Sequence, residues 1–259
     1  MMESEIVHSE MSELWLTAME QDLFPGDLVV EVGRLFLGAP YQTDTLETAG
    51  KEKLVINLAE FDCTTFVETT LALALCAAAG DLSPLNFRKK IKFIRYRQAK
   101  IDGYASRLHY FTDWLIDNEK KKSLKDVSRL LAGMPLRKKI NFMTAHRECY
   151  AGLKNEAAFE SMRQVEKNLS RRIFYIIGKD KVTKLQAEIR QGDIIALTTD
   201  QEGLDVAHVG FAVWQGRHLH LLHASSKEGA VVISKETLAA YLKSNKKFTG
   251  IIIARFQNI

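Results

Sequence analysis

The hydrophobic positions in the first third of the chain recur at helical spacing. Residues 27–37 place apolar side chains at positions 28, 32, 35 and 36, after Asp27 as a candidate N-cap and before Gly38. Residues 63–79 are rich in alanine and leucine, with apolar positions 67, 71, 74, 75 and 78 on one face. This periodicity predicts two α-helices, and the second of them is expected to be buried.

The pattern changes along the rest of the chain. From residue 83 to about 184 the signals are helical and amphipathic, with charge clusters and no strong strand. After Gly192 come short β-branched or apolar runs between turns, at residues 193–198, 207–214, 219–224, 230–234 and 250–256, with one helix predicted at 235–245. Helices followed by antiparallel strands favour an α+β fold. We expect one domain over residues 1–259, with a helical insertion at residues 81–190.

Composition narrows the class of protein. Of the 259 residues 46% are hydrophobic and 26% are charged, which is typical of a globular protein. The net charge of +4 is compatible with an anionic substrate and does not by itself indicate nucleic acid. The basic stretch 88–97 is better explained as a solvated helix face, with Phe87, Ile91 and Ile94 pointing inward, than as a nucleic-acid site. The oligomeric state is left open.

Targeting signals are not evident. No apolar run of 18 residues exists, so no membrane span is expected. Residues 1–20 are acidic and lack the basic start and apolar run of a secretory signal. We therefore expect a cytoplasmic protein, or a periplasmic or cell-envelope protein if a signal segment has been removed.

The cysteines and short motifs exclude several chemistries. Three cysteines, at positions 63, 76 and 149, cannot all pair and form no CxxC, so a disulfide framework or cysteine-rich zinc site is poorly supported. The sequence contains no HExxH, GxGxxG, P-loop or GxSxG string. We expect neither a metal nor a cofactor.

Cys63 is the best candidate nucleophile. It follows Asp62 at the start of the predicted buried helix, where unpaired N–H groups and the helix dipole would lower the thiol pKa. The same N–H groups could hold an oxyanion, and Asp62 could cap them. The alternative is that Cys63 is simply a small buried hydrophobic residue, as we expect for Cys76, while Cys149 is expected to have a packing role and no chemical one.

Two histidines are placed to serve as a general base and its partner. His208 and His223 flank a predicted hairpin whose turn is Gln215-Gly216. In that register the two histidines are directly opposed on one face of the sheet, while His220 faces the other side. His223 could then orient the His208 ring, although two structural strand histidines remain an alternative.

Several segments, in order, resemble one superfamily. Residues 37–41 (LGAPY) resemble its GTPY motif, and residues 62–67 (DCTTFV) resemble its DCSGFV nucleophile motif. Residues 191–195 (QGDII) resemble PGDLV, and residues 208–212 (HVGFA) resemble the HVGIY histidine motif. His223-Ala224 is similar to the IHA segment that follows it. The chain thus resembles the NlpC-type papain-like cell-wall cysteine peptidases.

This resemblance implies a papain-like α+β fold and a site. Cys63, His208 and His223 would be catalytic, with Tyr41 lining the active site and Asp62 beside the nucleophile. The chain departs from the pattern in having Thr64-Thr65 where Ser-Gly is usual, and 145 positions between Cys63 and His208. Together with residues 45–47, 104–110 and 250–255, these departures resemble one branch of the superfamily.

That branch implies N-acetylmuramoyl-L-alanine amidase activity on peptidoglycan fragments, including anhydro-muropeptides. A γ-D-glutamyl endopeptidase is the alternative enzyme, and a non-catalytic cell-wall-binding module is the alternative of another class. Tyr104 and Arg107 lie in the predicted insertion and could contact the substrate, Arg107 through a carboxylate. A buried structural network is an equally good explanation for these two residues.

Overall fold

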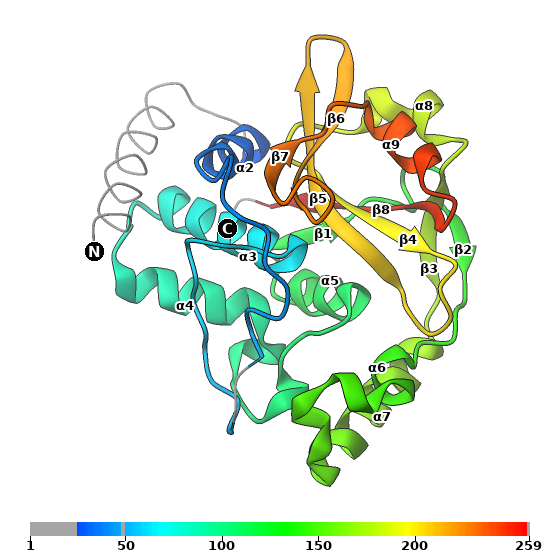
Figure 1. Cartoon of the computed structure of the whole chain (residues 1–259). Helices are drawn as coiled ribbons and strands as arrows, with labels where there is room; N and C mark the ends of the chain where they lie inside the picture. The colour runs from blue at the N-terminus through cyan, green and yellow to red at the C-terminus, as the bar shows by residue number, and fades with distance from the viewer. Residues whose placement is uncertain (1–24, 48–49, 258–259) are drawn as a thin grey trace.

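Antiparallel strands and flanking helices make up the fold (Figure 1). A computed structural model describes residues 25–47 and 50–257. Its helices are α2 (Pro25–Arg34), α3 (Cys63–Ala78), α4 (Pro84–Arg95), α5 (Phe111–Lys120), α6 (Phe142–Ala145), α7 (Glu156–Ser170), α8 (Val182–Leu185) and α9 (Leu238–Ser244). Its strands are β1 (Leu124–Asp126), β2 (Met134–Leu136), β3 (Phe174–Gly178), β4 (Ile194–Thr199), β5 (Val206–Gln215), β6 (His218–Ser225), β7 (Ala230–Ile233) and β8 (Phe248–Phe256).

The strands form one sheet in the order β2-β3-β8-β4-β5-β6-β7, with β1 also paired to β8, and every named pair is antiparallel. The five strands expected after residue 192 are all present, and so is the helix between them. The predicted mixture of helices and an antiparallel sheet is therefore confirmed.

The sheet separates two hydrophobic layers because successive strand residues face opposite sides. On β4, Ile194 and Ala196 pack against the layer that contains α2, α3, α4 and α5, whereas Ile195 and Leu197 pack toward α8 and α9. A third cluster joins α6 and α7 to the segment around Tyr104 and Tyr110. Figure 1 places α6 and α7 at the far end of the molecule from α9.

Two sequence expectations need correction. Helix α2 is described from Pro25 onward, so Asp27 lies inside the helix and is not its N-cap. The segment 81–190 is also not purely helical, since it contributes β1, β2 and β3. Strands β1 and β2 have three residues each and are held by pairing with distant segments, which local periodicity cannot reveal.

Helix α3 is the centre of the helical layer. Apart from its first two and last residues it is buried around its whole circumference, against α2, α4 and β5. Its Glu68 is paired with Arg95 of α4 at 2.6 Å, and both side chains are almost fully buried. Among the described residues no helix is long and apolar enough to span a bilayer.

Candidate active site

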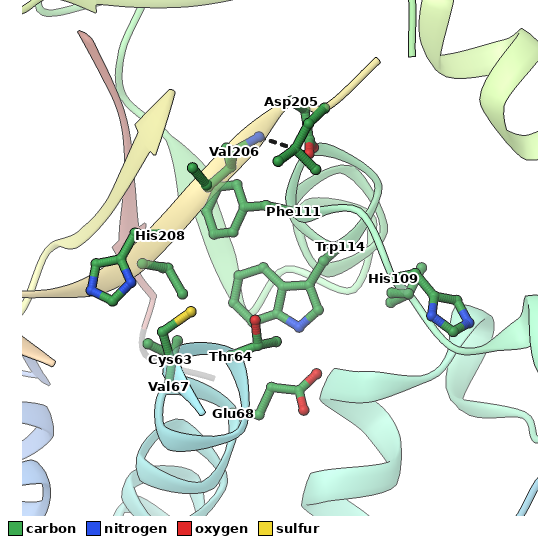
Figure 2. A pocket seen from close by; sticks show the side chains of 14 residues that line it. Cys63, Thr64, Val67, Glu68, His109, Phe111, Trp114, Asp205, Val206 and His208 are labelled. Carbon is green, nitrogen blue, oxygen red and sulfur yellow. Dashed lines mark hydrogen bonds between the residues drawn. The ribbon is translucent and has the colours of Figure 1, made fainter. Parts of the chain in front are cut away.

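Cys63 is the first residue of α3, at the end that faces the sheet (Figure 2). The helix starts here because of a capping box. Asp62 Oδ1 accepts the N–H of Thr65 at 2.7 Å, and Thr65 Oγ1 accepts the N–H of Asp62 at 2.9 Å. The expectation that Asp62 caps this helix is confirmed. Because the box uses two of the first N–H groups, those of Cys63 and Thr64 remain without an intrahelical acceptor.

The Cys63 thiol is in its protonated form at neutral pH. Its pKa is raised to about 12, first by burial and then by the negative charge of Asp62. Hydrogen bonding with the Val209 backbone and the Thr64 side chain opposes this shift and is the smaller effect. The expected lowering of the thiol pKa is therefore wrong for this state, because burial outweighs the helix N-terminus.

The β5–β6 hairpin carries the two candidate histidines, but its turn differs from the prediction. Gln215 pairs with His218, so the two central residues are Gly216 and Arg217. Gly216 has φ +61, and a glycine at the first central position suits the tight turns that match strand twist. The predicted Gln215-Gly216 turn is wrong by one residue.

This error moves the register by two residues and leaves the facing of the side chains intact. The predicted direct opposition of His208 and His223 is therefore replaced by a diagonal neighbourhood on the same face. Gly210 makes room for it, since a Cβ at this position would lie 2.8 Å from the Cβ of His223. His220 is held elsewhere, with Nδ1 2.8 Å from the carbonyl oxygen of Ser234.

His208 and His223 are in direct contact. His208 Nε2 lies 2.6 Å from Nδ1 of His223. If His208 donates in this bond, its Nδ1 is an unprotonated acceptor, and among the described residues Nδ1 has no other hydrogen-bond partner. Burial lowers the pKa of His208 to about 3 and that of His223 to about 4, so both rings are neutral near pH 7.

Tyr241 of α9 also touches the histidine pair and was not found from the sequence. Its ring meets His223 edge-on, with centroids 5.3 Å apart, and lies 6.4 Å from His208. Burial raises the pKa of its hydroxyl. Nothing in the sequence pointed to Tyr241, because it lies eighteen positions after His223 on a short helix and reaches the site only through the fold.

Cys63 and His208 line one cavity of about 120 Å³ (Figure 2). Its walls come from the start of α3, the start of α5 and the strand β5 with the loop before it. They are mainly apolar, and polar groups are contributed by Thr64, Glu68, His109, Asp205 and the indole of Trp114. Asp205 fixes α5 in place, since its carboxylate accepts the N–H and hydroxyl of Thr112 at 2.8 and 2.7 Å.

Tyr41 lies beside this site without lining the cavity. A β-bridge joins Tyr41 to Phe61, two residues before the nucleophile candidate. Burial raises the pKa of Tyr41 to about 12, and the next causes are the charges of Cys63 and Asp62. The expectation that Tyr41 lines the active site therefore stays a prediction: the residue is held next to the segment that leads to Cys63, and it is not among the residues that line the cavity.

Tyr104 and Arg107 do not join the Cys63 cavity. They line a second cavity of about 540 Å³ near residues 101–107 and 152–161. Arg107 is 7% exposed and pairs with Glu47 at 2.7 Å and Glu52 at 3.1 Å. The Tyr104 hydroxyl also donates to Glu47, at 3.1 Å. The structural-network explanation therefore describes these two residues better than the substrate contact.

Within residues 25–47 and 50–257 no group of three or more His, Cys, Asp or Glu side chains is arranged to hold a metal ion. His208 Nε2 and His223 Nδ1 form a hydrogen bond with each other.

The α+β fold places a thiol and a pair of histidines at one cavity, and similarity to a known protein family identifies the class of protein. A family model described as N-acetylmuramoyl-L-alanine amidase-like (AmiA-like) matches residues 31–251. The chain belongs to this family, which indicates a hydrolase of amide bonds.

Solved structures agree with the family. An N-acetylmuramoyl-L-alanine amidase from Bacteroides uniformis is 40% identical with a TM-score of 0.86, covering 90% of this chain and 99% of that one. A Bacteroides fragilis protein described as a candidate xylanase is 43% identical with a TM-score of 0.83, covering 87% and 99%. A Legionella pneumophila protein at 22% identity, TM-score 0.71 and coverage of 98% and 95% shares the fold. No protein of curated function matches the chain.

Proposed function

We propose that this protein hydrolyses the amide between the lactyl group of muramic acid and L-alanine in peptidoglycan fragments, with Cys63 as nucleophile. The observation that carries the proposal is the pairing of His208 with His223 at 2.6 Å beside the cavity that also holds Cys63. A thiol needs a base, and the base needs a partner that fixes its tautomer. Membership in the amidase-like family supports the same reaction.

The site contains a candidate chemical group for each step of the proposed reaction. Cys63 Sγ attacks the lactyl carbonyl carbon while its proton passes to His208 Nδ1. The C–N bond then breaks, and His208 returns the proton to the alanine nitrogen, leaving a lactyl thioester. Water attacks the thioester, His208 takes the proton from water, and the thiol is re-formed as the lactyl carboxylate leaves. His223 accepts the His208 Nε2–H throughout and stabilises the imidazolium.

The raised thiol pKa and the lowered imidazole pKa shape this mechanism. Burial penalises either charge formed alone, so the free enzyme rests as a neutral thiol and neutral imidazole. The attack creates both charges together as an attracted pair. The N–H groups of Cys63 and Thr64 point from the helix start and are available to the oxyanion. The mechanism requires Cys63 Sγ and His208 Nδ1 within about 4 Å.

We also infer that the chain is a papain-like protein of the NlpC type. The support is the order of its parts, a cysteine at the N-terminus of a buried helix followed by an antiparallel sheet that carries the histidines. A glycosidase function is an alternative hypothesis, since one similar structure is described as a candidate xylanase, and it would need two available carboxyl groups. The two carboxylates of the cavity, Glu68 and Asp205, are held by Arg95 and by Thr112.

The bond can be tested with defined substrates. The protein is incubated with an anhydro-muramyl tetrapeptide, with the same peptide lacking the sugar, and with intact sacculi. The products are identified by mass spectrometry. We expect a peptide that begins with L-alanine from the first substrate and little from sacculi. Cleavage after γ-D-glutamate in the sugar-free peptide would instead identify an endopeptidase. A protein inert on all three would be a binding module.

A further inference from the structure

The indole N–H of Trp114 is a buried hydrogen-bond donor without an acceptor among the described residues. Its side chain is 3% exposed, and among the described residues its indole Nε1 has no hydrogen-bond partner. A buried N–H donor without an acceptor costs about 1–3 kcal/mol, so such groups are rare and call for an explanation. Trp114 lines the Cys63 cavity, and Figure 2 shows its nitrogen turned toward the side where Thr64 and Glu68 lie.

A bound group that accepts a hydrogen bond from the Trp114 indole would meet a second polar side chain in the same wall. Glu68 Oε2 is held by Arg95 Nε at 2.6 Å, whereas Oε1 has no hydrogen-bond partner among the described residues. The Thr64 hydroxyl lines the same cavity. One wall thus offers an N–H donor from Trp114 and an oxygen acceptor from Glu68 or Thr64.

The rest of the cavity is mainly apolar. Leu108, Phe111 and Val206 contribute to its walls, and the volume of about 120 Å³ admits a small group. A carboxylate is a poor occupant, because Glu68 would repel it and the apolar walls would not solvate it. A secondary amide carrying a methyl group satisfies every feature, since its oxygen accepts from Trp114, its N–H donates to Glu68 or Thr64, and its methyl meets the apolar walls.

We propose that this cavity is a recognition subsite for a methyl-bearing secondary amide, read by the Trp114 indole N–H. The inference rests on the proposed function, because Cys63 opens into the same cavity and the bound amide would hold the scissile bond at the thiol. Two parts of a muropeptide have this chemistry. One is the acetamido group of the sugar, and the other is the amide that follows L-alanine.

Binding can be measured without any hydrolysis. In the ¹⁵N-labelled protein the indole N–H signal of Trp114 is assigned by its loss in Trp114→Phe, and N-acetyl-L-alanine N-methylamide is then titrated. We expect this signal to move downfield with saturation. Trp214 provides the matched control, since its indole already donates to the Ile189 carbonyl at 2.9 Å and should not move. A Trp114 signal that stays still, or moves only as Trp214 does, overturns the subsite.

Kinetics then identify the group. On an N-acetylmuramoyl-L-alanyl-D-isoglutamine substrate, Trp114→Phe should lower kcat/KM about tenfold, the effect of one buried hydrogen bond, while Trp214→Phe stays near wild type. On the analogue that lacks the recognised amide the Trp114→Phe penalty should vanish. A de-N-acetylated sugar tests the acetamido group, and an ester after L-alanine tests the peptide. A penalty unchanged on both analogues contradicts the proposal.

The two proposals fail separately. If wild-type protein hydrolyses none of these substrates, the proposed function is wrong, and the titration still decides whether the subsite exists. Because Trp114→Phe also removes volume, β-(3-benzothienyl)alanine at position 114 gives an isosteric check in which sulfur replaces N–H. It should reproduce the tenfold loss, and wild-type kinetics in this variant would show that the N–H is not read.

Discussion

Two polar clusters of similar appearance have opposite character in this protein. At the Cys63 cavity, His208 and His223 bind each other through one nitrogen each, so that His208 Nδ1 has no partner among the described residues, and the Cys63 thiol lines the same cavity. In the cluster around Arg107 the charged groups are paired with one another: Glu47 accepts from the guanidinium and from Tyr104, and Glu52 lies 3.1 Å from Arg107 Nε as an ion pair without hydrogen-bond geometry. Uncommitted groups are available for chemistry, whereas paired groups hold the segments that carry Glu47 and Glu52 to the residues around Arg107.

The sharpest way to break this comparison is to remove the uncommitted groups. Cys63→Ala or His208→Ala should lower turnover of a muramyl peptide by at least ~10³-fold, since members of a catalytic unit act together. Their unfolding temperatures should stay close to wild type. Cys149→Ala is the matched control, because this exposed cysteine lies away from the site and its loss should leave turnover unchanged. Full activity in Cys63→Ala would contradict the assignment.

Substitutions in the Arg107 cluster should lower stability and leave turnover unchanged. Arg107→Ala leaves two carboxylates without their buried partner, so we expect a loss of roughly 3 kcal/mol in the free energy of unfolding. The control is Arg163→Ala, which breaks an exposed pair with Glu160 and should cost less than about 0.5 kcal/mol. Urea unfolding measures both.

The KM of the folded Arg107→Ala variant then separates the two explanations for this residue. A structural role predicts an unchanged KM. A KM raised tenfold with normal stability would restore Arg107 as a substrate contact.

The comparison also shows what the sequence could predict. The Cys63 site was predicted from ordered family-like motifs together with local rules, the start of a helix and the alternation of strand residues, and His208 and His223 share one face even though the turn was misplaced by one residue. The sequence could not decide between a substrate contact and a structural network for Arg107, because its partner Glu47 lies sixty residues earlier, in a segment with no periodic signal. Tyr241 and the unpartnered indole of Trp114 depend on packing between distant elements, and no local pattern encodes them.

Substitution of His223 should lower kcat less than substitution of Cys63 or His208 does. His223→Ala removes the acceptor that fixes the His208 tautomer, and we expect about 10- to 100-fold lower kcat with KM nearly unchanged. His223→Asn, which can still accept a hydrogen bond, should recover part of the loss. Equal activity in all three proteins would show that His208 needs no partner.

Partly or fully buried neutral histidines occur beside both clusters, with His109 packed on Tyr104, and they predict a shared dependence on pH. Burial lowers the pKa of His208 and His109 to about 3 and that of His223 to about 4, whereas an unfolded histidine titrates near 6.5. Above pH 6.5 both states are neutral. As pH falls below 6.5 the unfolded chain binds protons first, so stability is lost progressively down to about pH 3–4.

The loss by pH 5 should reach up to about 2 kcal/mol for each histidine, less where solvent screens the ring. Urea unfolding at pH 7 and pH 5 measures it. His109→Gln keeps a donor for the Tyr104 carbonyl and should reduce the difference by one histidine's share. An identical pH dependence in this variant would mean that His109 is charged in the folded protein.

The central claim is that Cys63, with His208, cleaves the bond ahead of L-alanine. Its most direct test is mass spectrometry of an anhydro-muramyl tetrapeptide incubated with the wild-type protein and with Cys63→Ala, both with EDTA present. The account predicts a free peptide that starts with L-alanine, together with the sugar bearing a lactyl carboxylate, from the wild type alone. The same products from Cys63→Ala, or a cut after γ-D-glutamate by the wild type, would contradict it.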